Sequence, residues 1–250
     1  MSSLAVKVRE KRFAAVGDAP AHLALADLAI TVGQGEFVCL VGPSGCGKTT
    51  LLNIIAGLDR DFEGEVALPE VPGRSQPVIG YVFQSPRLLP WRTVIQNIEL
   101  VLGPDERGSG LVEELLEIAG LAPFRDSYPE RLSLGMSRRV ALIRAFAVRP
   151  DLLLMDEPFV SLDPARAQRL RRLLIDIWSA RPTTVMFVTH DLSEAIALAD
   201  RIILFSGPPG HVAADVPVAL ARDRRWERTE LEAARAELLG AVPALRAMAL

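Results

Sequence analysis

A glycine-rich loop with one lysine and two threonines lies near the start of the chain, at residues 42–50. It follows a short apolar run, residues 37–41, and leads into residues 51–56, which can form a helix. A strand, a glycine-rich loop and a helix start form a phosphate-binding loop, whose backbone N–H groups face one anion. We predict a nucleoside triphosphate site here rather than a simple Gly/Pro turn. The predicted nucleotide-binding residues are Gly42, Pro43, Ser44, Gly45, Cys46, Gly47, Lys48, Thr49 and Thr50.

Two adjacent acids, Asp156 and Glu157, end the apolar run of residues 152–155. An acid at the carboxyl end of a parallel strand beside the loop is where a Mg²⁺ ligand is needed. We therefore assign Asp156 to Mg²⁺ together with the Thr49 hydroxyl, and Lys48 to the β- and γ-phosphates. Glu157 is then the predicted general base for the attacking water. Without the loop, two solvated acids at a strand end would be the simpler interpretation.

Two further polar residues end predicted strands and are assigned to the same reaction. His190 follows an apolar run, and a neutral imidazole there is able to hydrogen-bond the γ-phosphate. Gln84 follows another run, where helical character begins, and its side-chain carbonyl is placed to contact Mg²⁺ or the water. Taken singly, each also fits a polar strand end or an ordinary surface residue. The loop and the acids favour the catalytic interpretation.

A second anion site is predicted at residues 132–136, just before a helix expected over 138–148. Ser133 and the following N–H groups, including those of Gly135 and Met136, would lie at the N-terminus of that helix. One chain with one phosphate loop does not need two anion sites. A dimer explains the second, which then closes over the γ-phosphate bound by the other chain. The alternative is an ordinary capped helix.

Composition narrows the possible functions. Half of the 250 residues are hydrophobic, which suffices for a large α/β domain with a substantial core. A net charge of −3 argues against a broad nucleic-acid-binding face. No uncharged apolar run reaches the length of about 18 residues needed to span a bilayer. The N-terminus is charged and lacks an apolar signal core, so we expect a cytoplasmic location, with Cys39 and Cys46 as unpaired thiols.

The pattern of apolar residues predicts the elements that position these groups. Strands are expected at residues 4–9, 28–32, 37–41, 78–83, 151–155 and 183–188. Helices are expected at residues 111–119 and 138–148, after the capping residues Asp163 and Asp191, and from 222 to 239. Glu194 is a predicted reciprocal capping partner of Asp191. The helical signals from 85 to 150 interrupt the strands, which indicates a helical insertion.

Together these segments resemble the ATPases of ATP-binding cassette (ABC) transporters, over nearly the whole chain. The loop matches Walker A, and His190 the switch histidine. Phe13, by its position before Walker A, matches the aromatic residue that stacks on adenine. The other matches are 83–86 to the Q-loop, 132–136 to the signature, 152–158 to Walker B with its catalytic glutamate, and 161–163 to the D-loop with Asp163.

The resemblance implies an α/β fold: a P-loop NTPase (RecA-like) core with an N-terminal antiparallel β-subdomain and an inserted helical subdomain. It implies an ATP-binding domain at residues 4–215, with the insertion at about 86–149, and a C-terminal helical extension at 216–250. Residues 83–91 and 206–210 are similar to the nitrate/sulfonate/taurine importer group. Lipid-transport or export ATPases, and soluble ABC ATPases outside transport, are the alternatives.

Cofactors and partners follow from the same resemblance. ATP and Mg²⁺ are the implied cofactors, and ATP hydrolysis drives import of a small anion. The implied partners are a second ATP-binding subunit, as a homodimer, transmembrane permease subunits and a periplasmic solute-binding protein, with no nucleic acid. The expected location is the cytoplasmic face of the inner (plasma) membrane.

Two residues depart from the family pattern. Leu134 stands where the signature has its first glycine, and Val160 stands near the D-loop where a small residue is common. If the backbone at 134 has a positive φ, leucine adds strain. If 134 belongs to an ordinary first helical turn, leucine fits. We expect a working ATPase that is slowed by Leu134.

Overall fold

The computed structural model describes residues 3–15, 17, 20–107, 110–160, 162–243 and 245. The chain divides into two compact units, and each is described by itself. Unit 1 contains Met1–Pro77 and Thr184–Leu250, and unit 2 contains Val78–Thr183. Among the described residues, none of the helices combines the length and the apolar character needed to cross a membrane.

An antiparallel sheet of three strands forms the first part of unit 1. Its order is β2-β1-β4. The strands are β1 (Leu4–Phe13), β2 (His22–Val32) and β4 (Glu63–Ala67). Alternation predicted β1, whose Leu4, Val6 and Val8 are buried, but the strand continues to Phe13. The sequence did not predict β4, because it is mostly polar and exposed and lacks an apolar face.

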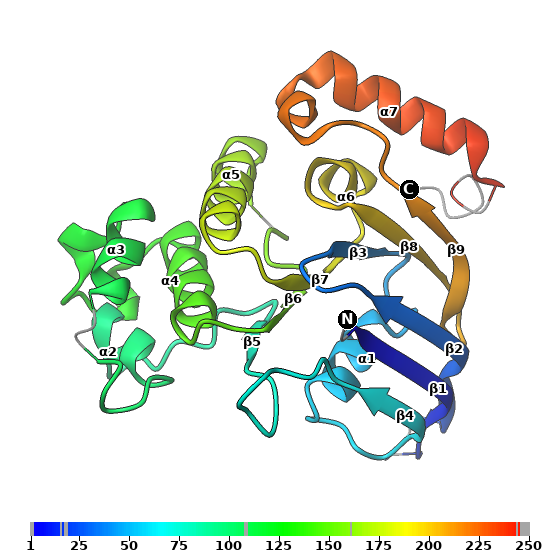
Figure 1. Cartoon of the computed structure of the whole chain (residues 1–250), viewed down its shortest axis with the longest axis horizontal. Coiled ribbons are helices and arrows are strands. Elements are labelled where there is room, and N and C mark those ends of the chain that lie inside the picture. The colour runs from blue at the N-terminus through cyan, green and yellow to red at the C-terminus, as the bar shows by residue number, and fades with distance from the viewer. Residues whose placement is uncertain are drawn as a thin grey trace. The chain divides into compact units, whose positions relative to one another are not determined.

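A second sheet of unit 1 has strand β3 (Phe37–Val41) between two parallel neighbours, β7 (Thr184–Thr189) and β8 (Arg201–Ser206). Strand β9 (His211–Pro217) pairs antiparallel with β8. Every residue of β3 and β7 is buried, as expected for central parallel strands. Helices α1 (Lys48–Ile55) and α6 (Leu192–Leu198) follow β3 and β7 (Figure 1).

The C-terminal segment differs from the single helix expected over 222–239. It forms a 3₁₀ helix, η3 (Arg222–Trp226), and then α7 (Arg228–Ala241), with Glu227 in an extended conformation between them. Arg222 Nη1 and Arg225 Nη1 donate to the carbonyls of Leu198 and Ala199 at the end of α6, at 3.2 and 2.7 Å. The C-terminal segment therefore supplies donors to carbonyls at the C-terminal end of α6.

Unit 2 contains a parallel strand pair and a group of helices (Figure 1). The strands are β5 (Ile79–Val82) and β6 (Leu152–Asp156). The helices are α2 (Val94–Glu99), α3 (Leu111–Ile118), α4 (Leu134–Ala147) and α5 (Pro164–Ala180), with 3₁₀ turns at Ala122–Phe124 and Pro129–Arg131. Helices α2 to α4 lie between β5 and β6 in the sequence, so the predicted helical insertion is present.

Several local predictions are confirmed. Asp163 caps α5 by accepting from the Arg166 N–H at 3.0 Å, and Asp191 caps α6 by accepting from the Ser193 N–H at 2.8 Å. Both cysteines are free and buried. One helix boundary was wrong: α4 begins at Leu134, four residues before the predicted start. Ser133 caps the helix, so the signature residues form its first turn.

Candidate functional site

The phosphate-binding loop connects the carboxyl end of β3 to the start of α1. Val41 is level with Thr189 of β7 and with Leu204 of β8, so the loop emerges at the carboxyl edge of parallel strands. Gly47 caps α1 with a φ of 93°, in the left-handed region. The first turn of α1 contains no acidic side chain. The positive end of the helix dipole is therefore not neutralised locally, as an anion site requires.

Lys48 extends back over the loop that precedes it. Its Nζ donates to the carbonyls of Gly42 and Pro43 at 2.7 and 2.8 Å, and lies 3.5 Å from Cys46 Sγ. The side chain is buried, whereas Thr49 is exposed. The loop thus surrounds one ammonium group and presents a hydroxyl beside it, a pairing suited to phosphates and a hard cation.

The loop is packed too closely against its neighbours to admit side chains at two of its glycines. A Cβ on Gly42 would lie 2.5 Å from the Phe205 carbonyl oxygen. A Cβ on Gly47 would lie 2.5 Å from Leu25 Cδ2 of β2. These glycines are needed for space, which is one reason the motif has them where it does.

Gly210, which is outside the predicted loop, also packs closely against it. A Cβ on Gly210 would lie 2.1 Å from the Cys46 carbonyl oxygen. Its N–H donates to Ala24 at 2.8 Å, and its carbonyl accepts from Ala26 at 3.1 Å. The turn before β9 therefore supports the loop directly. Sequence reasoning missed this role, although a Gly/Pro run that ends in glycine before an alternating strand was a usable signal.

His190 lies at the same edge of the sheet as the loop. It follows Thr189, which is level with the residue before Gly42, and it is exposed. The Thr189 hydroxyl donates to Glu194 Oε2 at 2.8 Å and accepts from the Asp191 N–H at 3.0 Å. The predicted reciprocal cap between Asp191 and Glu194 does not form as such, because the Asp191 N–H donates to Thr189 and Glu194 binds the Thr189 hydroxyl. This network fixes the backbone on both sides of His190.

Phe13 ends β1 at the rim of the antiparallel sheet. Its ring stacks on His22 with 5.2 Å between ring centroids, and Lys11 Nζ lies 4.6 Å from the Phe13 centroid. Phe13 is 37% exposed, so part of this aromatic residue is open to the solvent at the rim of the sheet. Its neighbour in the sheet, β2, is the strand that contacts Gly47.

The predicted acids and Gln84 lie together in unit 2. Asp156 is the last residue of β6 and is buried. Gln84 follows β5, whose Val82 is level with Met155, so the two strand ends carry Gln84 and Glu157 at matching levels. Burial, with a contribution from the Asp156 charge, raises the pKa of Tyr81. Glu157 has a φ of 42°, a left-handed conformation that is uncommon for a residue with a side chain.

The signature serine caps α4. Ser133 Oγ accepts from the Met136 N–H at 3.3 Å. Leu134 is the first helical residue, is 47% exposed and does not have a positive φ. The strain that would have slowed the enzyme is therefore absent, and leucine fits the first turn. Ser133 and Gly135 line a cavity of about 270 Å³, together with Ile118, Ala119, Arg139, Leu162, Arg166, Arg169, Leu170 and Leu173.

The predicted D-loop is described only in part. Asp163 caps α5 and forms an ion pair with Arg166 at 3.1 Å. Ser161 lies outside the described residues. Three arginines line the signature cavity, and no acid does. Arg166 is already paired with Asp163, and the other two arginines, Arg139 and Arg169, keep the lining of the cavity positive.

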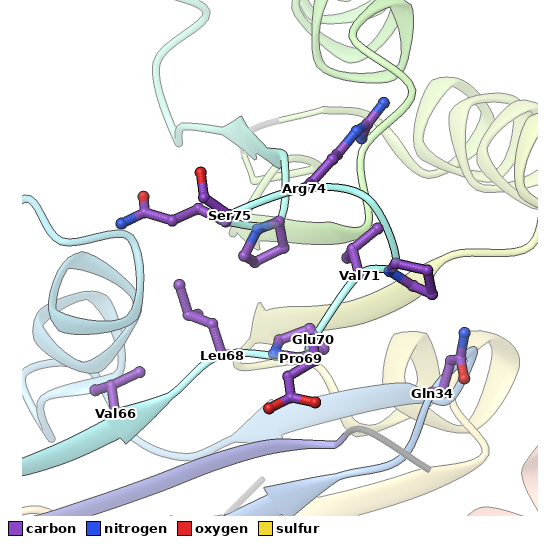
Figure 2. A pocket seen from close by; sticks show the side chains of 11 residues that line it. Gln34, Val66, Leu68, Pro69, Glu70, Val71, Arg74 and Ser75 are labelled. Carbon is purple, nitrogen blue, oxygen red and sulfur yellow. The ribbon is translucent and has the colours of Figure 1, made fainter.

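A separate cavity of about 830 Å³ lies in unit 1, beside the segment that follows β4. Figure 2 shows Glu70 and Arg74 among its lining side chains, with Gln34 from the turn before β3. None of the predicted site residues lines it, so this hollow is distinct from the phosphate-binding loop.

Comparison with known proteins identifies the family. The family model described as "ABC transporter" matches residues 25–160. The chain belongs to the ABC transporter family. An aliphatic sulfonates import ATP-binding protein of Burkholderia lata is 43% identical over 89% of this chain and 82% of its own length. One from Bacillus subtilis strain 168 is 40% identical over 95% of this chain and 93% of its own.

Solved structures of ABC cassettes confirm the predicted fold. The ATP-binding cassette MJ0796, in a dimeric post-hydrolysis state bound to ADP and Pi, is 31% identical and has a TM-score of 0.72. That match covers 87% of this chain and all of the other. The second structure, of cbiO1 from Clostridium perfringens, is 23% identical with a TM-score of 0.72 over 94% of each chain, and supports the fold. The chain is an ABC ATPase with a P-loop NTPase core.

Proposed function

We propose that this ABC ATPase energises the import of a small sulfonate-like anion through a separate permease. The observation that carries the proposal is the built phosphate loop, with Lys48 enclosed by it, in a chain 40–47% identical to aliphatic sulfonate import ATP-binding proteins. Taurine, a zwitterion, carries the same sulfonate group, and nitrate is a smaller oxyanion. In this proposal the ATP-binding domain comprises residues 4–215, with the helical insertion at about 86–149 and a C-terminal extension from 216.

The loop residues 42–50 hold the triphosphate. Backbone N–H groups and the α1 N-terminus face the phosphates, and Lys48 exchanges its carbonyl partners for the β- and γ-phosphate oxygens. Phe13 stacks on the adenine through its exposed surface. The Lys48 contacts in the structure support this assignment, because they already place the ammonium at the centre of the loop.

Thr49, Gln84 and Asp156 are the proposed Mg²⁺ ligands. Their hydroxyl, amide and carboxylate groups provide the oxygen-only donor set that Mg²⁺ prefers. When bound, Mg²⁺ neutralises phosphate charge. Asp156 is the last residue of β6 and is buried, so its carboxylate has a fixed place at the end of the strand.

Glu157 is the proposed general base, which accepts a proton from the attacking water at its carboxylate. His190 is the proposed sensor of the γ-phosphate through a ring nitrogen, and Gln84 orients the water. The role of His190 is supported by its position directly after β7, the strand that pairs with β3.

Ser133, Gly135 and Met136 are proposed to contact the nucleotide held by a second copy of this chain, with Asp163 at the same interface. The arginine-lined cavity at Ser133 supports an anion there. The dimeric form of the related cassette supports two cooperating copies. ATP-driven closure of the dimer would move the permease, on the cytoplasmic face of the inner membrane, and a periplasmic solute-binding protein would deliver the anion.

Glu157→Gln tests the mechanism in the full-length chain. We expect ATP hydrolysis to fall at least about 100-fold and an ATP-dependent dimer to accumulate, as measured by light scattering. Glu117→Gln, an exposed acid of α3, is the matched control and should behave as the unchanged chain. Full turnover by Glu157→Gln would show that another group is the base.

Import is tested on the complex. The tagged chain, purified from membranes, should bring down permease subunits and a solute-binding protein. Reconstituted in vesicles, that complex should transport an aliphatic sulfonate only with ATP. Recovery of an export or lipid-transport permease instead would refute import while leaving the ATPase assignment intact.

A further inference from the structure

Arg138 is a buried cation in the second turn of α4, the helix that begins at the signature. It is 7% exposed. Its Nη1 donates to the carbonyl oxygen of Pro158 at 2.7 Å, whereas its buried Nε has no hydrogen-bond partner in the described part of the chain. Burial lowers the pKa of Arg138. A charged group in this setting costs stability that one hydrogen bond only partly offsets.

The carbonyl that Arg138 binds belongs to the residue after Glu157. Glu157 has a φ of 42°, and its own carbonyl accepts from the Val160 N–H at 3.3 Å, so the chain turns tightly here. Pro158 and Phe159 are buried. A left-handed conformation at a residue with a side chain persists only when its surroundings fix it. The Arg138 hydrogen bond is one of the contacts that fix this turn.

Arg144, six residues further along α4, makes the same kind of contact with a second segment. Its guanidinium donates to the carbonyls of Pro86 and Arg87 at 2.8 and 3.0 Å, just after Gln84. Arg87 also has a positive φ, of 47°. Two arginines of one helix thus each hold a segment that contains a left-handed residue and a proposed active-site residue.

We propose that Arg138 is a positioning residue that holds the Glu157 carboxylate in its reactive place by fixing the 157–160 turn against α4. The inference rests on the proposed role of Glu157 as the base. It assigns Arg138 no contact with nucleotide or water. Because Ser133 caps α4, Arg138 also connects the helix proposed to contact one nucleotide to the base that acts on another.

The test compares Arg138→Met, Arg138→Lys and the unchanged full-length chain. Methionine fills similar space without a donor, and lysine restores a donor for the single carbonyl. We expect Arg138→Met to lower kcat by about tenfold or more while the Kd for a fluorescent ATP analogue stays within about twofold. Arg138→Lys should recover most of kcat. Hydrogen–deuterium exchange at residues 157–160 should increase in Arg138→Met and return towards normal in Arg138→Lys.

Arg139→Met is the matched structural control. Arg139 is the next residue of α4, is partly buried, and donates to the Ala119 carbonyl at 2.6 Å, far along the chain from Glu157. Its loss should destabilise the chain without changing exchange at 157–160. Should Arg138→Met fail to fold, Arg138→Gln, which keeps an N–H donor on a shorter side chain, takes its place in the same measurements, with intermediate values expected.

The outcomes separate this inference from the proposed function. Normal kcat and normal exchange at 157–160 in Arg138→Met, with Glu157→Gln inactive, would overturn the role of Arg138 alone. Equal loss of activity in the methionine and lysine variants would also overturn it, because general packing would then explain the effect. Full activity in Glu157→Gln would instead refute the base, and the exchange measurement would still report whether Arg138 fixes the turn.

Discussion

The phosphate-binding loop of unit 1 and the turn after β6 in unit 2 are held by opposite means. The loop is held by close approach of backbones, as at Gly210, where a Cβ would lie 2.1 Å from the Cys46 carbonyl oxygen. The turn after β6 is held by a long side chain, Arg138, that reaches a carbonyl from a neighbouring helix. A backbone contact leaves no room for change, whereas a side-chain contact can be exchanged for another donor. The first region should therefore be less tolerant of substitution.

The largest effect is expected for Lys48→Met, which removes the one ammonium inside the loop. Nucleotide affinity should fall by about 100-fold or more, since a buried charge-assisted contact to phosphate is lost. Isothermal titration with ATP measures it. Lys7→Met, which removes an exposed lysine paired with Glu65, is the control and should bind ATP normally. An unchanged affinity in Lys48→Met would mean that backbone groups alone hold the phosphates.

Gly210→Ala tests whether the loop depends on contacts outside its own motif. The added methyl group must displace the Cys46 carbonyl, so ATP affinity should fall by about tenfold and the melting temperature should drop by several degrees. Gly103→Ala is the matched control, because its Cβ would meet only the end of the Glu106 side chain, at 3.5 Å. Equal ATP affinity and equal melting temperature in the two variants would contradict the inference that close backbone contacts hold the loop.

Arg144→Met tests whether a long side chain of α4 stabilises a neighbouring segment through its carbonyls. Losing the bonds to Pro86 and Arg87 should lower the free energy of unfolding by about 1–3 kcal/mol, because two carbonyls, one of them part-buried, lose a charged donor. Arg144→Lys should restore part of it. Urea unfolding of the three proteins measures the difference. If lysine restores nothing, the planar guanidinium itself is required, and the contact is less exchangeable than we infer.

The smallest effect is expected for Leu134→Gly, which restores the glycine of the family pattern. Residue 134 is an exposed first helical position without a positive φ, so glycine relieves no strain and weakens the helix by at most about 1 kcal/mol. Steady-state hydrolysis should change by less than about twofold. A clear rise in rate would show that Leu134 hinders the reaction by a route other than backbone strain.

The positions of the candidate site residues could be predicted because each lies at or just after the end of a strand with a strong signal. The buried strands β3, β6 and β7 are nearly all apolar; the loop and His190 come directly after β3 and β7, and Asp156 is the last residue of β6. The predicted fold is confirmed for the same reason. The sequence could not predict which backbone segments approach each other closely, or which distant carbonyl a long side chain contacts. The Gly/Pro run before β9 marks a tight turn at Gly210, but it does not identify Cys46 as the neighbour, and no local pattern indicates that Arg138 reaches Pro158, because both contacts join residues far apart in the chain.

Weakly patterned elements were missed or displaced. Strand β4 is mostly polar and lacks an apolar face, and β9 alternates only between exposed and half-buried residues, so both gave a weak signal. The start of α4 was placed too late because Gly135 has low helix propensity, which the Ser133 cap outweighs. The C-terminal helix was predicted as one piece, since nothing in its composition marks the extended Glu227.

Arg222 and Arg225 connect the C-terminal segment of the chain to the proposed reaction site. They donate to the last carbonyls of α6, whose first turn is capped one residue after His190. A chain shortened before Arg222 would leave those carbonyls to the solvent and loosen the helix that anchors His190. Removing the C-terminal segment should therefore weaken the response of His190 to the γ-phosphate, even though every catalytic motif is still present.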